Sequence, residues 1–228
     1  MVRIVFYVLV SASVLVNIAP LAFAQALTPY TVTITNLTQG QSFTSILVLT
    51  HTKNFTMFNA GSAPNDELTI FAESGDSAPM ISLLQDSEDV LDIQNSEARL
   101  DPGESVTLTV NGNTTNSRIS AAGVLNPTND GFFSILGMKL PPKKNKTKVG
   151  TAIAYDAGSE LNDESCASIP GPLCDGEGLS TNTLGEGFIH VHAGIHGIGD
   201  LIEAERDWRN PVARIAIIQT SENSLRSE

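Results

Sequence analysis

Apolar and polar side chains alternate along several short segments of this chain, and few folds accommodate that pattern. Residues 30–35 place Val32 and Ile34 between threonines, and residues 105–110 repeat the period of two. Because successive side chains of a β-strand point to opposite faces, the pattern predicts strands with one buried face. Turns rich in Asn, Gly and Pro separate these segments. Further strands are predicted at residues 45–50, 118–125, 132–140, 148–155 and 212–218.

Residues 64–92 depart from this alternation. Residues 64–67 are typical of a helix start, and Leu68 and Phe71 follow at helical spacing. A second short helix is predicted after Pro79. We expect the apolar faces of both helices to cap an open end or an edge of the sheet. The predicted fold class is therefore all-β, an antiparallel β-sandwich with one or two short helices in this segment.

Residues 1–24 are typical of a secretory signal peptide. Arg3 supplies the positive charge, residues 4–16 form the apolar core, and residues 22–24 match the small-x-small rule for cleavage before Gln25. An uncleaved anchor is the alternative, because the apolar stretch is nearly long enough to span a bilayer. Cleavage predicts a mature chain without a membrane span that is secreted, periplasmic or displayed at the cell surface.

The chain contains two cysteines, Cys166 and Cys174, in a segment predicted to be a loop. A close pair of cysteines in an exported chain predicts a local disulfide. A redox-active pair fits less well, because the two thiols lack the two-residue spacing of such motifs. The length of 228 residues suits one domain, which we place at residues 28–220, followed by a disordered polar tail at residues 221–228.

Charge and motif content exclude several classes of function. Lysine and arginine number 13 against 25 aspartates and glutamates, so no basic stripe is available to neutralise the phosphates of a nucleic acid. The sequence has no Gly-x-Ser-x-Gly elbow, no phosphate-cradling loop and no dinucleotide fingerprint. We therefore expect a protein that is not an enzyme and does not bind nucleic acid.

Two turns carry carboxylates at the ends of predicted strands. The turn at residues 126–131 contains Asp130, and the turn at residues 155–160 contains Asp156 and Glu160. If the intervening strands pair in antiparallel fashion, these carboxylates lie at the same end of the sheet. Carboxylates that meet there repel one another unless a cation or a proton intervenes. Because Ca²⁺ takes hard oxygen ligands and suits loops rich in Gly, Asn and Asp, we expect the three carboxylates to bind one calcium ion.

The same turns carry a family resemblance. Residues 128–133, followed by residues 155–160, resemble the two signature turns of the spondin N-terminal domain family. The resemblance covers roughly residues 28–220. Further segments that resemble the single-domain microbial members of that family are residues 31–38, 49–51 and 207–214.

The resemblance implies an extracellular antiparallel β-sandwich with bound calcium. Animal spondins use this domain for adhesion to matrix, to cell-surface receptors or to microbial glycans. The family's calcium ligands correspond to Asp130, Asp156 and Glu160 of this chain. The animal pattern usually has an aspartate at the position of Glu160, so the reach of this ligand differs.

A histidine-rich loop forms a second candidate site. His190 and His192 point to one face if their segment is a strand, and His196 follows a glycine-containing turn. Three imidazoles placed in this way predict a Zn²⁺ or Cu²⁺ site, and His51, at the end of another predicted strand, could complete it.

Two other interpretations of these histidines remain open. With three protein ligands and a water molecule, a zinc ion could be hydrolytic, although no helical zinc-protease signature is present. Alternatively, the histidines only make hydrogen bonds within a glycine-rich loop, with Glu186 and Asp200 as nearby partners.

The sequence therefore predicts an exported calcium-binding β-sandwich module for adhesion or extracellular ligand recognition. Its partner would be an extracellular protein or a glycan. The first alternative is a periplasmic or surface metalloprotein that binds Zn²⁺ or Cu²⁺ through His190, His192 and His196. The second alternative is a purely structural envelope protein.

Overall fold

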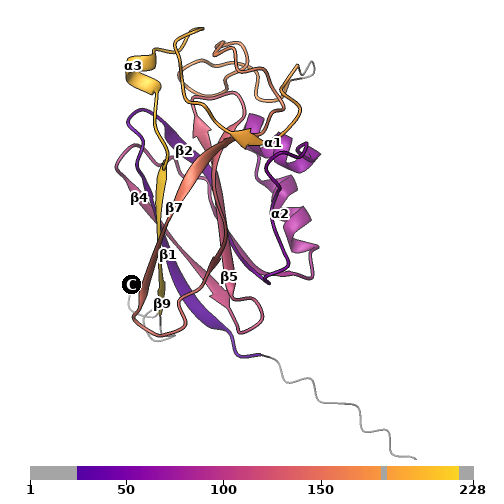
Figure 1. The fold of residues 1–228 in the computed structure, drawn as a ribbon, viewed down its shortest axis with the longest axis vertical. Helices are drawn as coiled ribbons and strands as arrows, with labels where there is room; N and C mark the ends of the chain where they lie inside the picture. The colour runs from indigo at the N-terminus through magenta and orange to yellow at the C-terminus, as the bar shows by residue number, and fades with distance from the viewer. Residues whose placement is uncertain (1–24, 181–183, 221–228) are drawn as a thin grey trace, which may run out of the picture.

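The computed structural model describes residues 25–180 and 184–220. In this part of the chain, nine antiparallel strands form one curled, nearly closed sheet accompanied by three short helices (Figure 1). The predicted all-β class is confirmed. The predicted signal peptide at residues 1–24 and the predicted tail at residues 221–228 lie outside the described residues.

The strand order in the sheet is β3-β2-β5-β6-β7-β9-β1-β4, and β8 pairs with β7 beside this path. Each strand predicted from alternation is present. The structure adds β3, β8 and the helix α3 to the strands and helices predicted above. The strands are β1 (Thr28–Asn36), β2 (Ser42–His51), β3 (Val90–Ser96), β4 (Ser105–Gly112), β5 (Arg118–Asn126), β6 (Gly131–Lys139), β7 (Thr147–Asp156), β8 (His190–Val191) and β9 (Ala213–Gln219). The helices are α1 (Asp66–Ser74), α2 (Ala78–Gln85) and α3 (Glu203–Arg206).

Strand β7 belongs to both halves of the sheet. Its residues 147–152 pair with β9, whereas its residues 153–156 pair with β6. At the opposite side, the two edge strands β3 and β4 approach each other, and Asp92 Oδ2 accepts hydrogen bonds from the backbone N (2.7 Å) and Nδ2 (2.9 Å) of Asn111. The division into two separate sheets of a sandwich is therefore not confirmed.

Neighbouring phenylalanines of β6 enter two different cores. Phe133 points into the interior of the sheet, where its ring centroid lies 4.5 Å from that of Phe43. Phe132 points outward into a second core that includes Phe71 of α1 and Leu84 of α2. Because β-strand side chains alternate between faces, a strand that is apolar at successive positions needs a cover on each face.

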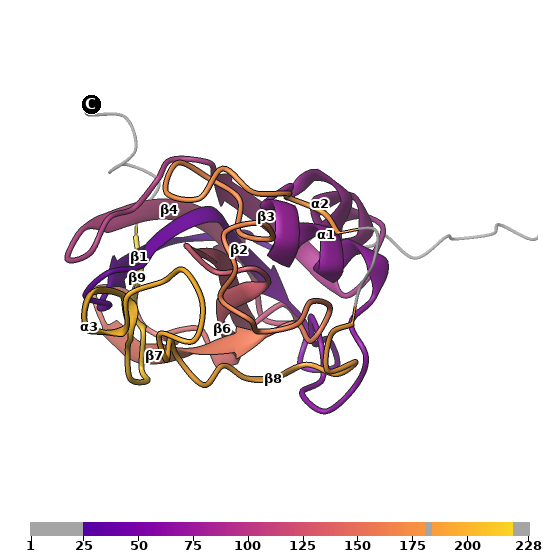
Figure 2. The ribbon, with the colours of Figure 1, turned by 90° about the horizontal axis from the view of Figure 1, so that it is seen from above.

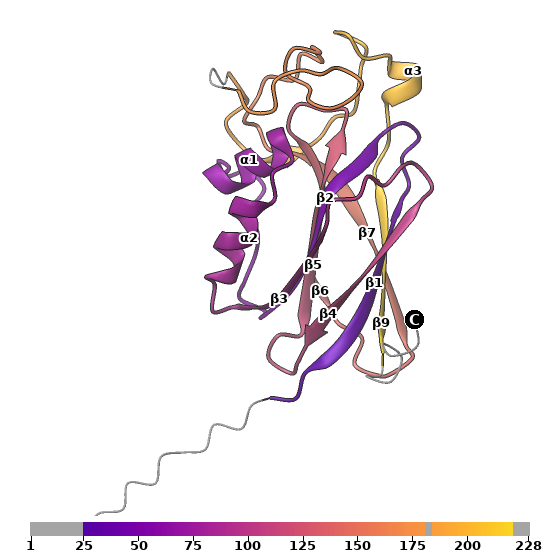
Figure 3. The same cartoon turned by 180° about the vertical axis from the view of Figure 1, so that it is seen from behind.

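The helices α1 and α2 supply the outer cover (Figure 3). The two predicted helices are confirmed, but the prediction that they cap an end or an edge is wrong. The central strand β2 explains the difference, because Leu47 and Leu49 point outward to the helices while Val48 points into the interior. An uncovered outer face would leave these leucines in water.

Long connections gather over one end of the sheet, where they include residues 157–180, 184–189 and 192–212 (Figure 2). The predicted disulfide between Cys166 and Cys174 is confirmed and closes a short loop in this region. None of the helices in the described residues is long and apolar enough to cross a membrane.

Candidate functional site

The two acidic turns meet at the loop-covered end of the sheet, as the sequence predicted. Strand β6 begins at Gly131, and this residue pairs with Asp156, the last residue of β7. Asp130 directly precedes this pair, and its carbonyl oxygen accepts a hydrogen bond from the backbone N of Ala157 at 3.2 Å. Antiparallel pairing of β6 and β7 therefore brings Asp130 and Asp156 together.

Asp130 is fully buried, and its two carboxylate oxygens differ in their partners. Oδ2 accepts hydrogen bonds from the backbone N of Ser159 at 2.9 Å, from the Ser159 hydroxyl and from the backbone N of Glu160 at 3.1 Å. Oδ1 has no hydrogen-bond partner. Burial, followed by the nearby charge of Asp156, raises the pKa of Asp130 well above its ordinary value.

The turn that supplies these donors depends on Gly158. Its φ of 70° lies in the left-handed region, and an added Cβ would lie 2.3 Å from the carbonyl oxygen of Phe188. A side chain at this position would therefore both strain the backbone and push the 184–189 segment away from the turn.

Asp156 is also fully buried. Its Oδ1 accepts a hydrogen bond from the backbone N of Gly158 at 2.7 Å, and its Oδ2 accepts one from Nδ2 of Asn162 at 2.5 Å. Burial raises the pKa of Asp156 despite the opposing effects of Asn162 and His190. Among the described residues, only His190 and His192 lie at ion-pairing distance from it, at 3.6 and 4.0 Å.

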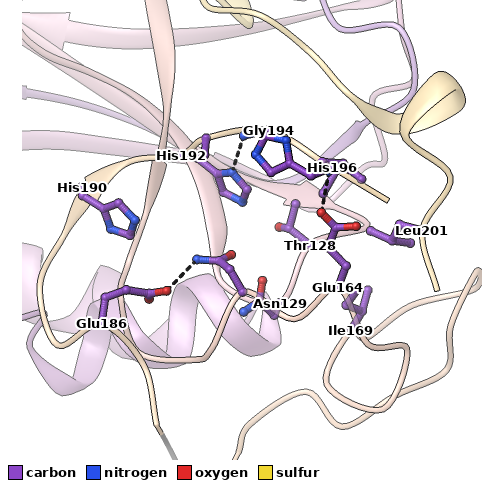
Figure 4. A pocket seen from close by; sticks show the side chains of 13 residues that line it. Thr128, Asn129, Glu164, Ile169, Glu186, His190, His192, Gly194, His196 and Leu201 are labelled. Atoms are coloured by element: carbon purple, nitrogen blue, oxygen red, sulfur yellow. Dashed lines mark hydrogen bonds between the residues drawn. The ribbon is translucent and has the colours of Figure 1, made fainter. Parts of the chain in front are cut away.

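His190 and Glu186 complete a group of possible metal ligands around Asp156. Strand β8 pairs with the end of β7, so that His190 is opposite Asp156. One ligand atom from each of Asp156, Glu186 and His190 lies within 4.8 Å of the others. Two of the three residues, Glu186 and His190, line one side of a cavity of about 210 Å³ (Figure 4). This group could hold a metal ion.

His192 lies between His190 and His196 in the wall of this cavity (Figure 4). Its Nδ1 accepts a hydrogen bond from the backbone N of Gly194 at 3.1 Å, whereas its Nε2 has no hydrogen-bond partner. Burial, with smaller effects of His190 and His196, lowers the pKa of His192 to about 4. Because Nδ1 accepts this hydrogen bond, the neutral imidazole that is present near pH 7 carries its proton on Nε2.

The other two predicted histidine ligands do not join this group. His196 is exposed and lies at the far side of the cavity, where its backbone N donates to Glu164 at 2.6 Å (Figure 4). His51 lies at the opposite end of β2 and β5, and both of its ring nitrogens have partners, Thr52 and Ser120. A four-histidine site is therefore not formed.

The two acidic residues predicted as partners of the histidine loop have different roles. Glu186 lies beside His190, as described above, and accepts a hydrogen bond from Asn162 at 3.2 Å. Asp200 instead accepts a hydrogen bond from the backbone N of Cys166 at 2.8 Å. It therefore fixes the start of the disulfide loop.

The carboxylate of Glu160 points away from Asp156. Its Oε1 accepts a hydrogen bond from the hydroxyl of Ser180, and its Oε2 is buried without a partner. Burial, followed by the charges of Glu73, Asp163 and Glu177, raises the pKa of Glu160 from 4.5 to about 7. The structure therefore brings Asp130 and Asp156 together and places the Glu160 carboxylate beside helix α1.

Two acidic residues at this end of the molecule were not identified as ligand candidates from the sequence. Glu186 was expected only as a hydrogen-bond partner of the histidine loop. Because Glu186 and Asp156 are far apart along the chain, the sequence does not indicate that they lie close together. Glu73 of α1 was not considered, because a glutamate on an amphipathic helix is ordinarily a solvated residue. In the structure Glu73 is buried.

The arrangement supplies buried carboxylate oxygens and imidazole nitrogens without a neighbouring lysine or arginine among the ion pairs of the described residues. Such a set is suited to holding a cation. A comparison of the sequence with models of known protein families and with curated proteins gives no match.

Proposed function

We propose that this chain is an exported recognition module whose loop-covered end is organised by a divalent cation bound at Asp130 and Asp156. Calcium is the first candidate. The observation that carries the proposal is the buried pair of carboxylates, of which Asp130 Oδ1 has no hydrogen-bond partner. The resemblance to the spondin N-terminal domain remains a prediction and agrees with this proposal.

The electrostatic argument starts from the repulsion between the two carboxylates. Burial makes ionisation of both Asp130 and Asp156 unfavourable, and their mutual repulsion adds to the penalty for Asp130. A bound cation reverses both effects because it stabilises the ionised form. The oxygen-rich residues Asn129 and Asn162 border the adjoining cavity and could complete a coordination shell with water.

The surface around this site supports a role in recognition. Residues 157–205 contain no lysine or arginine. Several large apolar side chains of this segment are exposed to solvent, among them Leu161, Phe188, Val191 and Ile198. Loops that expose apolar groups on a rigid sheet are commonly used for binding. The proposed ligand is an extracellular protein or a glycan, and the disulfide is compatible with an oxidising extracellular compartment.

A second candidate function is binding of Zn²⁺ or Cu²⁺ at Asp156, Glu186 and His190. The observation that favours it is the mutual distance of their ligand atoms, within 4.8 Å. An imidazole ligand suits these metals better than calcium, which prefers oxygen ligands. His192 is the nearest further imidazole, and its Nε2 would bind the metal only in the other tautomer, without the hydrogen bond from Gly194 to Nδ1.

Metal analysis of the mature protein, purified without chelators or a histidine tag, tests the proposal. Calcium in the wild type and in His190→Gln, together with its loss in Asp130→Asn and Asp156→Asn, would support the calcium site. Zinc or copper that is lost in His190→Gln and kept in Asp130→Asn would support the second candidate. The control is Asp86→Asn, an exposed carboxylate at the end of α2. A wild type that binds none of these metals would refute both.

Recognition is tested separately, with the same proteins in the presence of Ca²⁺ or EDTA. We expect binding to a glycan array or to surfaces coated with extracellular matrix, and we expect EDTA and Asp156→Asn to abolish it. Binding that persists equally in EDTA would show that the cation does not organise the recognition surface.

A further inference from the structure

A second pair of buried carboxylates lies between helix α1 and the long loop. Glu73, in the last turn of α1, is 1% exposed, and Glu160 is 4% exposed. Ser180 bridges them: its backbone N donates to Glu73 Oε2 at 3.0 Å, and its hydroxyl donates to Glu160 Oε1. The three residues are far apart in sequence, so only the fold creates this contact.

Each of the two carboxylates retains one buried oxygen without a hydrogen-bond partner. These atoms are Oε1 of Glu73 and Oε2 of Glu160. Neither carboxylate takes part in an ion pair among the described residues. A buried carboxylate that lacks both a cation and a full set of donors is strongly unfavourable. The pair therefore needs a compensating group.

The position of Glu73 adds a further unfavourable interaction. The C-terminal end of a helix carries partial negative charge, which repels a carboxylate. The last turn of α1 contains no basic residue to offset this repulsion. Arg99 borders the same cavity of about 330 Å³ as Glu73, but its guanidinium group is paired with Asp101 at 2.6 Å. No basic side chain in the described part of the chain therefore neutralises Glu73, and a cation from solution would do so.

We propose that Glu73 and Glu160, bridged by Ser180, form a second cation site that attaches helix α1 to the loop of residues 157–180. Two carboxylates and a hydroxyl are hard oxygen ligands, and Ca²⁺ is the cation that suits them. Water in the cavity beside Glu73 would complete the coordination. The site goes beyond the proposed function, because it does not depend on a cation at Asp130 and Asp156.

The two sites are nevertheless neighbours. The backbone N of Glu160 donates to Asp130 Oδ2 at 3.1 Å, while the side chain of Glu160 extends to Ser180. The turn after β7 therefore contributes its backbone to one site and its carboxylate to the other. In this structure the carboxylate of Glu160, which the sequence assigned to a calcium site with Asp130 and Asp156, contacts Ser180.

Equilibrium dialysis with Ca²⁺ alone tests the inference on the full mature chain. We expect two ions per chain in the wild type, one in Glu73→Gln, one in Asp130→Asn and none in the double variant. Glu88→Gln, an exposed glutamate after α2, is the matched control and should retain both ions. Ser180→Ala keeps both carboxylates and the backbone N that donates to Glu73, and it should weaken the second site about tenfold by removing the hydroxyl that orients Glu160.

Hydrogen exchange gives a readout that is independent of stoichiometry. Ca²⁺ should slow exchange of the backbone amides in the last turn of α1 in the wild type and in Asp130→Asn, but not in Glu73→Gln. This pattern would not arise if only the site at Asp130 and Asp156 were occupied.

Three results would overturn the inference. If Glu73→Gln binds as many ions as the wild type, Glu73 does not hold a cation. If Glu73→Gln and Asp130→Asn each abolish all binding, the residues form one joint site. If only Asp130→Asn loses an ion, the proposed function holds and the second site fails. If Glu73→Gln does not fold, the Ser180→Ala variant is the deciding test. A Ca²⁺ affinity equal to that of the wild type in this variant would contradict the second site.

Discussion

The Nε2 atom of His192 lies 4.0 Å from Oδ2 of Asp156 and has no hydrogen-bond partner. On its other side, the centroid of the imidazole ring lies 4.8 Å from that of the ring of Trp208. The histidine therefore connects the buried carboxylate to the only tryptophan of the chain. Because of this contact, the protonation of His192 and the binding of a metal at Asp156 can both be measured.

The protonation of His192 should affect stability in a defined pH range. Burial lowers its pKa in the folded protein to about 4, from an ordinary value of 6.5. Between these pH values the unfolded chain binds more protons than the folded chain, so the contribution of His192 to the free energy of unfolding rises with pH. We expect metal-free wild type to gain about 2–3 kcal/mol over His192→Gln between pH 4 and 6.5.

Urea denaturation of both proteins in EDTA, at pH intervals across this range, measures the difference. His196→Gln is the comparison variant: it keeps the buried imidazole of His192, and since His196 contributes less than burial and His190 to the lowered pKa of His192, most of the pH dependence should remain. Parallel stability profiles for the wild type and His192→Gln would contradict the prediction.

Terbium can report on the site at Asp156 through Trp208. Tb³⁺ replaces Ca²⁺ at oxygen-rich sites, and a nearby indole transfers excitation energy to it. We expect tryptophan-sensitised Tb³⁺ emission in the wild type, displacement by excess Ca²⁺, and loss of the signal in Asp156→Asn. Trp208→Phe should retain binding in dialysis while losing the emission, and emission that survives in this variant would mean that the ion lies elsewhere.

Sequence reasoning succeeded where the signal is local. The alternation in residues 30–35 marks β1 because a strand with one buried face shows its pattern within a few residues. The convergence of Asp130 and Asp156 also followed, because each lies at the end of a strand and the two strands are consecutive.

Sequence reasoning is insufficient where a structural feature depends on contacts between residues that are distant in sequence. The apolar run in β2 indicated a central strand but not that two helices cover its outer face. The sequence placed Glu160 with Asp156, four residues away, whereas its carboxylate contacts Ser180 and lies near Glu73. The direction of a side chain in a turn depends on the residues that the fold places around it. The sequence of the turn does not identify those residues.

The two cores can be separated by neighbouring substitutions in β6. Phe132 and Phe133 are both fully buried, so replacement of either by alanine should destabilise the protein by about 3–5 kcal/mol. Phe132→Ala removes contacts under α1 and α2, and hydrogen exchange should therefore increase first in these helices. Phe133→Ala should instead increase exchange in β2 and β5. Identical exchange patterns in both variants would contradict the separation into an inner and an outer core.

The disulfide should stabilise the loop beside the site more than the sheet. Cys166 and Cys174 close a short loop, and in the chain-entropy model the loss of this closure costs about 2–3 kcal/mol. We expect the double serine variant to have a lower melting temperature and faster exchange in residues 163–180. A variant with unchanged exchange in the loop and increased exchange in β1 and β9 would refute this assignment.

The buried carboxylate of Asp130 predicts a reversal of sign between metal-free and metal-bound protein. Its pKa in the folded state is raised, so the folded chain binds more protons than the unfolded chain above the ordinary pKa, and stability falls as pH rises. At pH 7.5 in EDTA, Asp130→Asn should therefore be more stable than the wild type by about 1–3 kcal/mol, because it removes a buried charge that has hydrogen bonds but no ion-pair partner among the described residues. In millimolar Ca²⁺ the order should invert, since only the wild type gains from binding. Thermal unfolding in both buffers measures the two differences, and a variant that is less stable by the same amount in both would show that Asp130 acts through its hydrogen bonds alone.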